Sequence, residues 1–184
     1  MIPAGTHAFS PPDGQLLLKV FREGMAARMG HDLVFEVRNW SAEVVVDPTE
    51  LSRSTLEATA EISSFSILEA TGGAKALGRG DKADIKRNIE EKILDAIRFP
   101  AISFRSTGAE VIDERQVRIA GELTIAATTR PAAMDLNLDG GRAKGTMTVI
   151  QSQWGIKPFS AMMGALKVRD TVEVTLEVPV PTGA

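Results

Sequence analysis

The side chains best suited to acid–base or metal chemistry are few in this chain. It has two histidines, His7 and His31, and no cysteine, which excludes disulfides, thiolate catalysis and cysteine-ligated metals. The two histidines lie far apart in the sequence, and no pair of metal-binding residue types has the i, i+4 spacing of a helical metal site. We therefore predict no metal and no cofactor.

His31 is followed directly by Asp32 at the start of an expected strand. The pair is typical of a polar strand terminus, or alternatively of a histidine that hydrogen bonds to the head group of a ligand. A third interpretation is an acid–base pair acting on an apolar substrate. No serine lies in a nucleophile-elbow pattern, and most acidic residues alternate outward along expected strands. We predict no catalytic residues and a protein that is not an enzyme.

Large apolar side chains are more informative about function. Met25 and Met29 lie on one expected loop, and Met162 and Met163 lie on another. Methionine adapts to irregular shapes, so such loops suit an apolar ligand, although ordinary core packing is the alternative for each residue. The candidate ligand contacts are Phe21, His31, Leu33, Phe35, Ile62, Phe65, Phe99, Phe104, Leu123, Ile125, Met147, Trp154, Phe159, Met162 and Met163.

One helical pattern is present among the elements that must position these residues. Isoleucine recurs at every fourth position between residues 84 and 98, which predicts an amphipathic helix. Asp81 or Asp84 can cap its start, and Pro100 requires it to stop. A single amphipathic helix set among strands needs an apolar surface or opening to cover. The isoleucines are Ile85, Ile89, Ile93 and Ile97.

Most of the remaining chain alternates between apolar and polar residues, which predicts about eight or nine strands. Each strand has one buried and one wet face, so we expect an antiparallel sheet. A sheet of this size closes into a barrel or folds into a sandwich, and such a barrel can hold one small ligand. The expected strands span 15–22, 31–38, 39–47, 56–67, 101–106, 116–127, 134–139, 143–151 and 172–178.

Composition narrows the possible partners and compartments. With 184 residues and 43% hydrophobic residues, the chain fits one globular domain. A net charge of -3 argues against nucleic acid as a partner. No apolar window reaches the roughly 18 residues of a membrane span, so we expect no stable membrane insertion. No signal peptide pattern is present; we expect a cytoplasmic protein, or a periplasmic or secreted one if a signal was removed.

Several motifs follow one another in a specific order along the chain. This order resembles the YceI-like family of polyisoprenoid-binding proteins, whose early Phe-x-x-x-His segment corresponds here to Met29-Gly-His-Asp-Leu33. The motifs are Ile97-Arg-Phe-Pro-Ala-Ile-Ser-Phe-Arg-Ser106, Val117-Arg-Ile-Ala-Gly-Glu-Leu-Thr-Ile-Ala-Ala-Thr-Thr-Arg-Pro131, Ser152-Gln-Trp-Gly-Ile156 and Gly164-Ala-Leu-Lys-Val-Arg-Asp-Thr-Val-Glu-Val174.

The resemblance implies an all-β fold: an extended antiparallel, lipocalin-like barrel in a single domain, 1–184, with the helix packed against it. It also implies that a long isoprenoid, such as a polyprenyl lipid or quinone tail, is held in the barrel without catalysis. Family members are often periplasmic or secreted. A homodimer stays open as a further partner.

Three functions remain in competition at this point: a carrier for an isoprenoid lipid, an enzyme on a lipocalin-like barrel, and a barrel filled by its own side chains that serves as an interaction module. Small residues on the inner face distinguish the carrier from the filled barrel, because they leave space for a ligand inside. The small residues expected to face inward are Ala58, Ala60, Gly121, Ala127 and Gly145.

Overall fold

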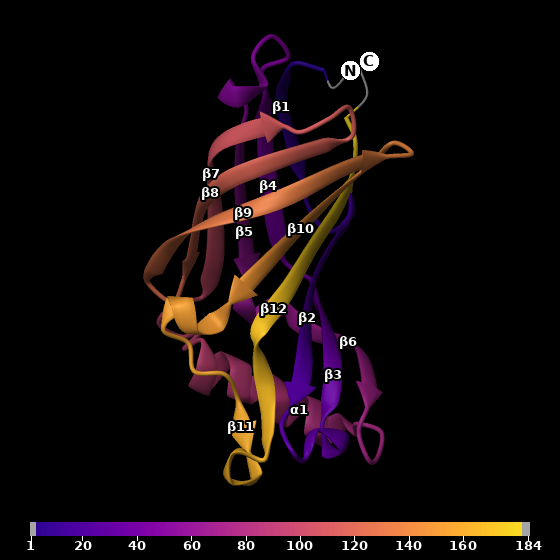
Figure 1. Ribbon diagram of the computed structural model, residues 1–184, viewed down its shortest axis with the longest axis vertical. Helices are drawn as coiled ribbons and strands as arrows, with labels where there is room; N and C mark the ends of the chain where they lie inside the picture. Colours follow the sequence, from indigo (N-terminus) through magenta and orange to yellow (C-terminus); the bar gives the residue numbers. More distant parts are fainter. Residues whose placement is uncertain (1–2, 182–184) are drawn as a thin grey trace.

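A single twelve-stranded antiparallel sheet dominates the part of the chain that the computed structural model describes, residues 3–181 (Figure 1). The strands are β1 (Gly5–Phe9), β2 (Gln15–Glu23), β3 (His31–Val37), β4 (Trp40–Val46), β5 (Thr55–Glu61), β6 (Phe65–Gly72), β7 (Ala101–Val111), β8 (Gln116–Ile125), β9 (Thr128–Asp139), β10 (Arg142–Ile150), β11 (Ser160–Ala161) and β12 (Leu166–Pro179).

The sheet curls into a half-barrel, and its two ends belong to one long, bent hairpin. Its strands follow the order β1-β4-β5-β7-β8-β9-β10-β12-β2-β3-β6, with β11 paired to β12. β3 runs directly into β4, and β5 runs into β6 through the 3₁₀ turn Ile62–Ser64. At the bend, the N–H of Arg38 donates to the carbonyl of Ser64 (3.2 Å), and the N–H of Glu61 donates to that of Asn39 (3.0 Å). The hairpin therefore joins the first and last parts of the sheet.

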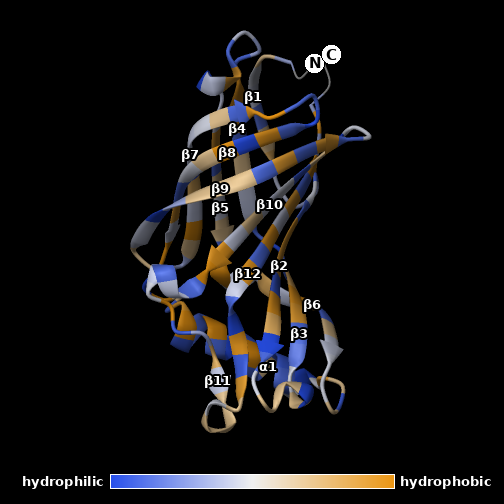
Figure 2. Ribbon diagram, viewed as in Figure 1, coloured by the Kyte–Doolittle hydropathy of each residue, from blue (hydrophilic) through white to orange (hydrophobic). Residues whose placement is uncertain are grey.

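Alternation along the strands sorts side chains between the interior and the solvent. On β10, Ala143, Gly145, Met147 and Val149 are buried, whereas the residues between them are exposed. Figure 2 shows this alternation as bands of apolar and polar residues along the strands. Because successive side chains point to opposite faces, the apolar face lies inside the curl. The predicted all-β, antiparallel, lipocalin-like class is confirmed.

The number of strands differs from the expected eight or nine. The segment 56–67 was expected to be one strand, but it is broken between β5 and β6, and β1 and β11 were not expected. The break occurs at Ile62, whose side chain is fully buried and whose N–H donates to the carbonyl of Pro100 (2.9 Å). This tertiary hydrogen bond interrupts the strand pairing at Ile62. The alternation of apolar and polar residues in the sequence does not predict it.

The helical segment α1 (Arg79–Arg87) continues into a π-helical turn, η4 (Asn88–Ile93), and crosses the lower half of the barrel in Figure 1. Asp81 lies at the third helical position and accepts a hydrogen bond from the N–H of Gly78 (2.9 Å). Lys86 fastens the helix to the sheet, since its Nζ donates to the carbonyl of Phe65 (3.2 Å). The amphipathic helix packed on the barrel is therefore confirmed.

The boundaries predicted for this helix, about 84–98, are wrong. It begins five residues earlier, because Asp81 acts inside the first turn and Gly78 precedes it. It ends at Ile93, well before Pro100, because the wider π turn is followed by Asp95 in a left-handed conformation (φ 48°). Ile97 consequently leaves the isoleucine face and is 93% exposed. A four-residue repeat does not distinguish an α turn from a π turn.

The two tryptophans are both buried but differ in hydrogen bonding. Trp154, in the 3₁₀ turn η5 (Gln151–Trp154) after β10, donates from Nε1 to the carbonyl of Leu123 (2.9 Å). Trp40, at the start of β4, has no partner for its Nε1 within the described residues. Trp154 thus fastens η5 to β8, whereas the Trp40 indole contributes only its apolar surface.

We predict that Trp154→Phe destabilises the protein more than Trp40→Phe does. Both changes remove the same atoms, but only the first leaves a carbonyl without its donor, at a cost of about 1–3 kcal/mol. Trp154→Ala is expected to lower the free energy of unfolding by about 3–5 kcal/mol. Urea unfolding of the lipid-free proteins measures the difference, and equal losses for the two phenylalanine variants would contradict the assignment.

Candidate functional site

An apolar cavity of about 500 Å³ lies inside the curled sheet. Its walls come from both halves of the bent hairpin, from the strands between them and from the helical segment. This volume falls within the roughly 300–1,000 Å³ of small-molecule sites. Buried polar or charged residues are absent from the described part of the chain, so the enclosed part of the cavity offers a ligand almost only hydrocarbon.

Inward-facing positions of the strands form most of the wall. On β2, the alternate residues Leu16, Leu18 and Val20 face the cavity. The deeper wall comes from β7 to β10, with Phe104, Leu123, Ile125, Met134, Met147 and Val149. Period-two alternation therefore places both sets on one continuous apolar surface.

The helical segment covers the remaining side. Ile85, Ile89 and Ile93 line the cavity, with Asn88 and Leu94 beside them. These isoleucines are only partly buried although they pack against the core. The helical segment therefore closes the cavity with an apolar face that is itself packed against the core.

Polar side chains gather where β2, β3 and the start of β12 approach the end of the cavity. Arg22, His31, Lys75, Asp81 and Lys167 all line it there. One terminal nitrogen of Arg22 donates to the carbonyl of Gly30 (2.7 Å), and Nε2 of His31 lies 2.9 Å from the carbonyl of Lys75. The cavity therefore has a polar, charged rim at one end and a wall that is mostly apolar elsewhere.

The position of His31 depends on a glycine. Gly73 has a left-handed backbone (φ 76°), and a Cβ there would lie 2.2 Å from Nε2 of His31. Any larger residue would displace the imidazole from the carbonyl of Lys75. Gly73, directly after β6 in a stretch that the sequence shows only as irregular, thus makes room for His31 at the rim.

His31 and Asp32 do not form an acid–base pair. They are consecutive on β3, so their side chains point to opposite faces of the strand. His31 lines the cavity, whereas Oδ1 of Asp32 accepts the backbone N–H of Arg22 (2.9 Å) and lies 3.9 Å from that residue's Nε. The geometry gives the enzyme interpretation no support at these two residues.

The carboxylates with perturbed acidity lie away from the cavity. A hydrogen bond from Arg118 lowers the pKa of Asp135 on the outer face of β9, and one from the Thr49 side chain lowers the pKa of Asp47. Both shifts are explained by surface hydrogen bonds and mark no site. Between residues 3 and 181, no three His, Asp or Glu side chains cluster closely enough to hold a metal ion.

Nine of the predicted ligand contacts line the cavity. They come from five strands and one loop, so only the fold brings them together. Their contact with a ligand stays a prediction, but their place in the wall is a property of the structure. The nine are His31, Leu33, Phe35, Phe65, Phe104, Leu123, Ile125, Met147 and Phe159.

Two of the other six predicted contacts belong to the barrel's surfaces rather than to its cavity wall. Phe21 lies between inward-facing Val20 and Arg22 on β2, so its ring points outward, 5.0 Å from Nζ of Lys19. Phe99 lies outside the wall beneath Arg98, whose Cζ is 5.2 Å from the ring centre. Both residues were predicted as ligand contacts because they are aromatic. Strand alternation turns Phe21 outward, and the early end of the helix leaves Phe99 outside the cavity wall.

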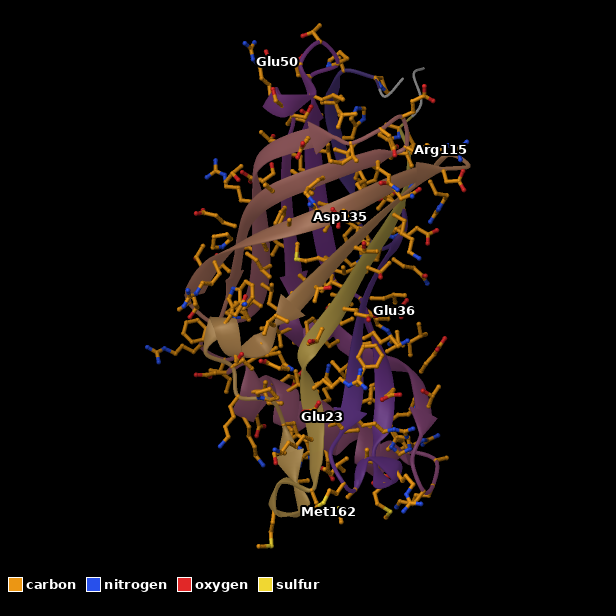
Figure 3. All side chains as sticks on the ribbon, viewed as in Figure 1. Glu23, Glu36, Glu50, Arg115, Asp135 and Met162 are labelled. Atoms are coloured by element: carbon orange, nitrogen blue, oxygen red, sulfur yellow. The ribbon has the colours of Figure 1, made fainter. Side chains whose placement is uncertain are left out.

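The remaining four lie in the packed core or at the tip of a loop. Ile62 packs in the separate hollow beneath α1, and Trp154 is bonded to β8. Met162 and Met163 are exposed at 56% and 107%, and Figure 3 shows Met162 at the lower tip of the molecule. None of the four lines the main cavity.

Several wall residues were not predicted, and most had a usable signal. Trp40 lines the cavity and begins a strand whose alternation groups it with Ala42. Leu16 and Leu18 alternate with Leu17 and Lys19 along β2. The two-residue period of a strand therefore identifies Leu16 and Leu18 as wall residues once the inward face is known. Phe21 was predicted as a ligand contact because it is aromatic. The alternation along β2 turns its neighbours Val20 and Arg22 inward and therefore turns Phe21 outward.

Of the five small residues expected to face inward, Ala127 is exposed in the β8–β9 turn instead, and the other four divide into two groups. Ala58 and Ala60 line the cavity and leave space in it. The space at the two glycines is filled by neighbours: a Cβ on Gly121 would lie 2.4 Å from Cζ of Phe104, and one on Gly145 would lie 2.5 Å from Sδ of Met134. The barrel is therefore packed at the glycine positions and hollow beside β5.

Known structures share this fold at low sequence identity. Burkholderia cenocepacia BcnA aligns with a TM-score of 0.65 and 14% identity, over 90% of this chain and 94% of that one. A YCEI protein of Campylobacter jejuni aligns with a TM-score of 0.56 and 17% identity, over 80% and 84%. A polyisoprenoid binding domain from Saccharophagus degradans aligns with a TM-score of 0.56 and 6% identity, over 97% and 100%.

The sequence itself shows the family more directly than these structures do. No curated protein matches the chain. Residues 22–180 match the profile of the YceI-like domain. This range leaves out β1 and most of β2, but it includes every wall residue of the cavity except Leu16, Leu18 and Val20. The resemblance of the ordered motifs is thereby confirmed: the chain belongs to the YceI-like domain family.

Proposed function

We propose that this protein binds a long-chain polyisoprenoid, or a similar apolar lipid, inside the curled sheet and carries or sequesters it without chemical change. The observation that supports this most strongly is the cavity, whose wall is mostly apolar and whose charged residues are confined to one end. The Saccharophagus degradans domain that shares the fold is described as polyisoprenoid binding, which agrees with the same class of ligand.

The energetics favour a chain of several units. Burying one five-carbon unit gains at most about 4 kcal/mol, at about 0.8 kcal/mol per carbon group. Association alone costs about 4–15 kcal/mol. Several units must therefore be buried for useful affinity.

The rim suits the polar end of such a lipid. Arg22, His31 and Lys75 line the cavity where its wall becomes polar. Hydrogen bonds to the carbonyls of Gly30 and Lys75 hold the side chains of Arg22 and His31 in place. We expect the head group, whether a phenol, a quinone or a phosphate, to lie among these residues while the chain extends inward.

Trp40 provides a direct optical test. The chain has two tryptophans and no tyrosine, and only Trp40 lines the cavity. We predict that titration with a prenyl lipid changes the fluorescence of wild type and of Trp154→Phe, whose remaining indole is Trp40. Trp40→Phe should bind the same lipid but show a much smaller change. A full response from Trp40→Phe, or no response from Trp154→Phe, would place the lipid elsewhere.

Filling part of the cavity should weaken binding without harming the fold. Ala58 lines the hollow beside β5, so Ala58→Phe should lower the affinity for a prenyl lipid about tenfold or more, because at least one chain unit loses its place. Ala120→Phe on the exposed outer face of β8 is the matched control. Titration calorimetry and thermal unfolding of both variants measure the two effects; unchanged affinity in Ala58→Phe would contradict an internal site.

His31→Ala separates a carrier from an enzyme. The side chain makes one hydrogen bond, to the carbonyl of Lys75, so we predict an intact fold and only a modest loss of lipid affinity, below about tenfold. The thermal midpoint and the affinity check these outcomes. If wild type turns over an isoprenoid substrate and His31→Ala does not, the carrier function gives way to an enzymatic one.

A further inference from the structure

We infer that the tip of the barrel next to the polar rim docks on an anionic lipid bilayer and that lipid enters or leaves the cavity there. The inference extends the proposed function, on which its transfer step rests, but docking itself does not require the cavity to hold a lipid. The tip consists of the β2–β3 loop, residues 24–30, and of residues 159–165, which comprise Phe159, β11 and the turn that joins β11 to β12.

The two loops form one surface. The N–H of Ala26 donates to the carbonyl of Ala165 (2.8 Å), and a Cβ on Gly24 would lie 2.4 Å from that same oxygen. The loops therefore meet backbone to backbone. In Figure 3, Met162 marks the lower end of the molecule, opposite the end at which Arg115 lies.

Large apolar side chains extend from this tip into solvent. Met25 is 94% exposed and Met163 fully exposed, and Met29, Phe159 and Met162 are also exposed. Methionine has a flexible, unbranched side chain that adapts to a fluid apolar phase better than to a rigid pocket. Such a concentration of exposed apolar residues on two adjoining loops marks an interaction surface.

The backbone holds two of these side chains outward at a cost. Met162 and Met163 have φ angles of 51° and 54°, in the left-handed region that residues with a side chain rarely adopt. Glycine would fit both positions with less strain. Strain of this kind collects where function requires a particular presentation, and here it presents consecutive methionines to solvent.

Charge around the tip favours an anionic surface as the partner. The segments 22–32 and 157–167 contain four basic and two acidic side chains, an excess of two positive charges in a protein whose net charge is -3. One of the acids, Asp32, lies 3.9 Å from Nε of Arg22. Arg28, Lys157 and Lys167 are exposed. Apolar side chains surrounded by basic ones are typical of peripheral attachment to anionic lipid.

The tip is continuous with the cavity. Met29, Phe159 and Lys167 line the cavity and are exposed at the same end. A lipid chain leaving a bilayer at this tip would therefore reach the apolar wall without crossing water. No helix within residues 3–181 is long and apolar enough to cross a membrane, so the attachment proposed here is to the bilayer surface.

Vesicle co-sedimentation of the lipid-free full chain tests the docking. Wild type should bind phosphatidylcholine vesicles that contain phosphatidylglycerol, bind phosphatidylcholine alone more weakly, and release in high salt. The double variant Met162→Asp/Met163→Asp should lose about tenfold or more of its affinity, because two carboxylates replace apolar contacts with an anionic surface.

Ile112→Asp is the matched control. Ile112 is 53% exposed, close to the 56% of Met162, and lies in the β7–β8 turn. It should bind vesicles like wild type, and all variants should keep the thermal midpoint. Arg28→Glu/Lys157→Glu should weaken binding to phosphatidylglycerol vesicles and leave binding to phosphatidylcholine unchanged.

Three outcomes would overturn the inference. In the first, wild type binds neither type of vesicle. In the second, the double methionine variant binds as well as wild type. In the third, light scattering shows a wild-type dimer that Met162→Asp/Met163→Asp converts to a monomer, and neither protein binds vesicles; the tip would then be an interface between two copies. Since the vesicles contain no prenyl lipid, failure of docking is independent of failure of the lipid titration.

Discussion

The bent hairpin formed by β3–β4 and β5–β6 is the constraint on which the rest of the structure depends. Its two halves belong to opposite ends of the strand order, so the sheet cannot lie flat while the backbone hydrogen bonds at the bend are intact. Ile62, fully buried at that bend, anchors it against the segment before β7. Because the curl follows from this connection, every inward-facing side chain is brought to a common interior.

That interior is larger than its side chains fill. Phe104 and Met134 occupy the space beside two glycines, but Ala58 and Ala60 leave a hollow beside β5. An unfilled apolar volume forfeits dispersion contacts and weakens a fold, and a bound hydrocarbon chain would restore them. Binding and stability are thus coupled, since a lipid that occupies the cavity only in the folded state stabilises that state.

The two ends of the molecule differ, because the polar rim of the cavity and the exposed apolar loops lie at the same end. Polar groups that could meet a head group lie at one end, held by Gly30 and by the backbone of Lys75, and the exposed methionines lie next to them. The helical segment, with its π turn, closes the same half of the barrel with partly buried isoleucines. Entry, recognition and closure can therefore all take place at one end.

Local pattern in the sequence determined the class of the fold, because alternation of period two and an isoleucine repeat depend only on neighbouring residues. It also determined wall residues such as Leu123 and Met147, which follow that alternation. Tertiary structure alone decided the register of β2, which turns Phe21 outward, the π turn that exposes Ile97, and the bond that places Trp154 in the core. Those outcomes depend on contacts between residues distant in the chain, and no local pattern contains them.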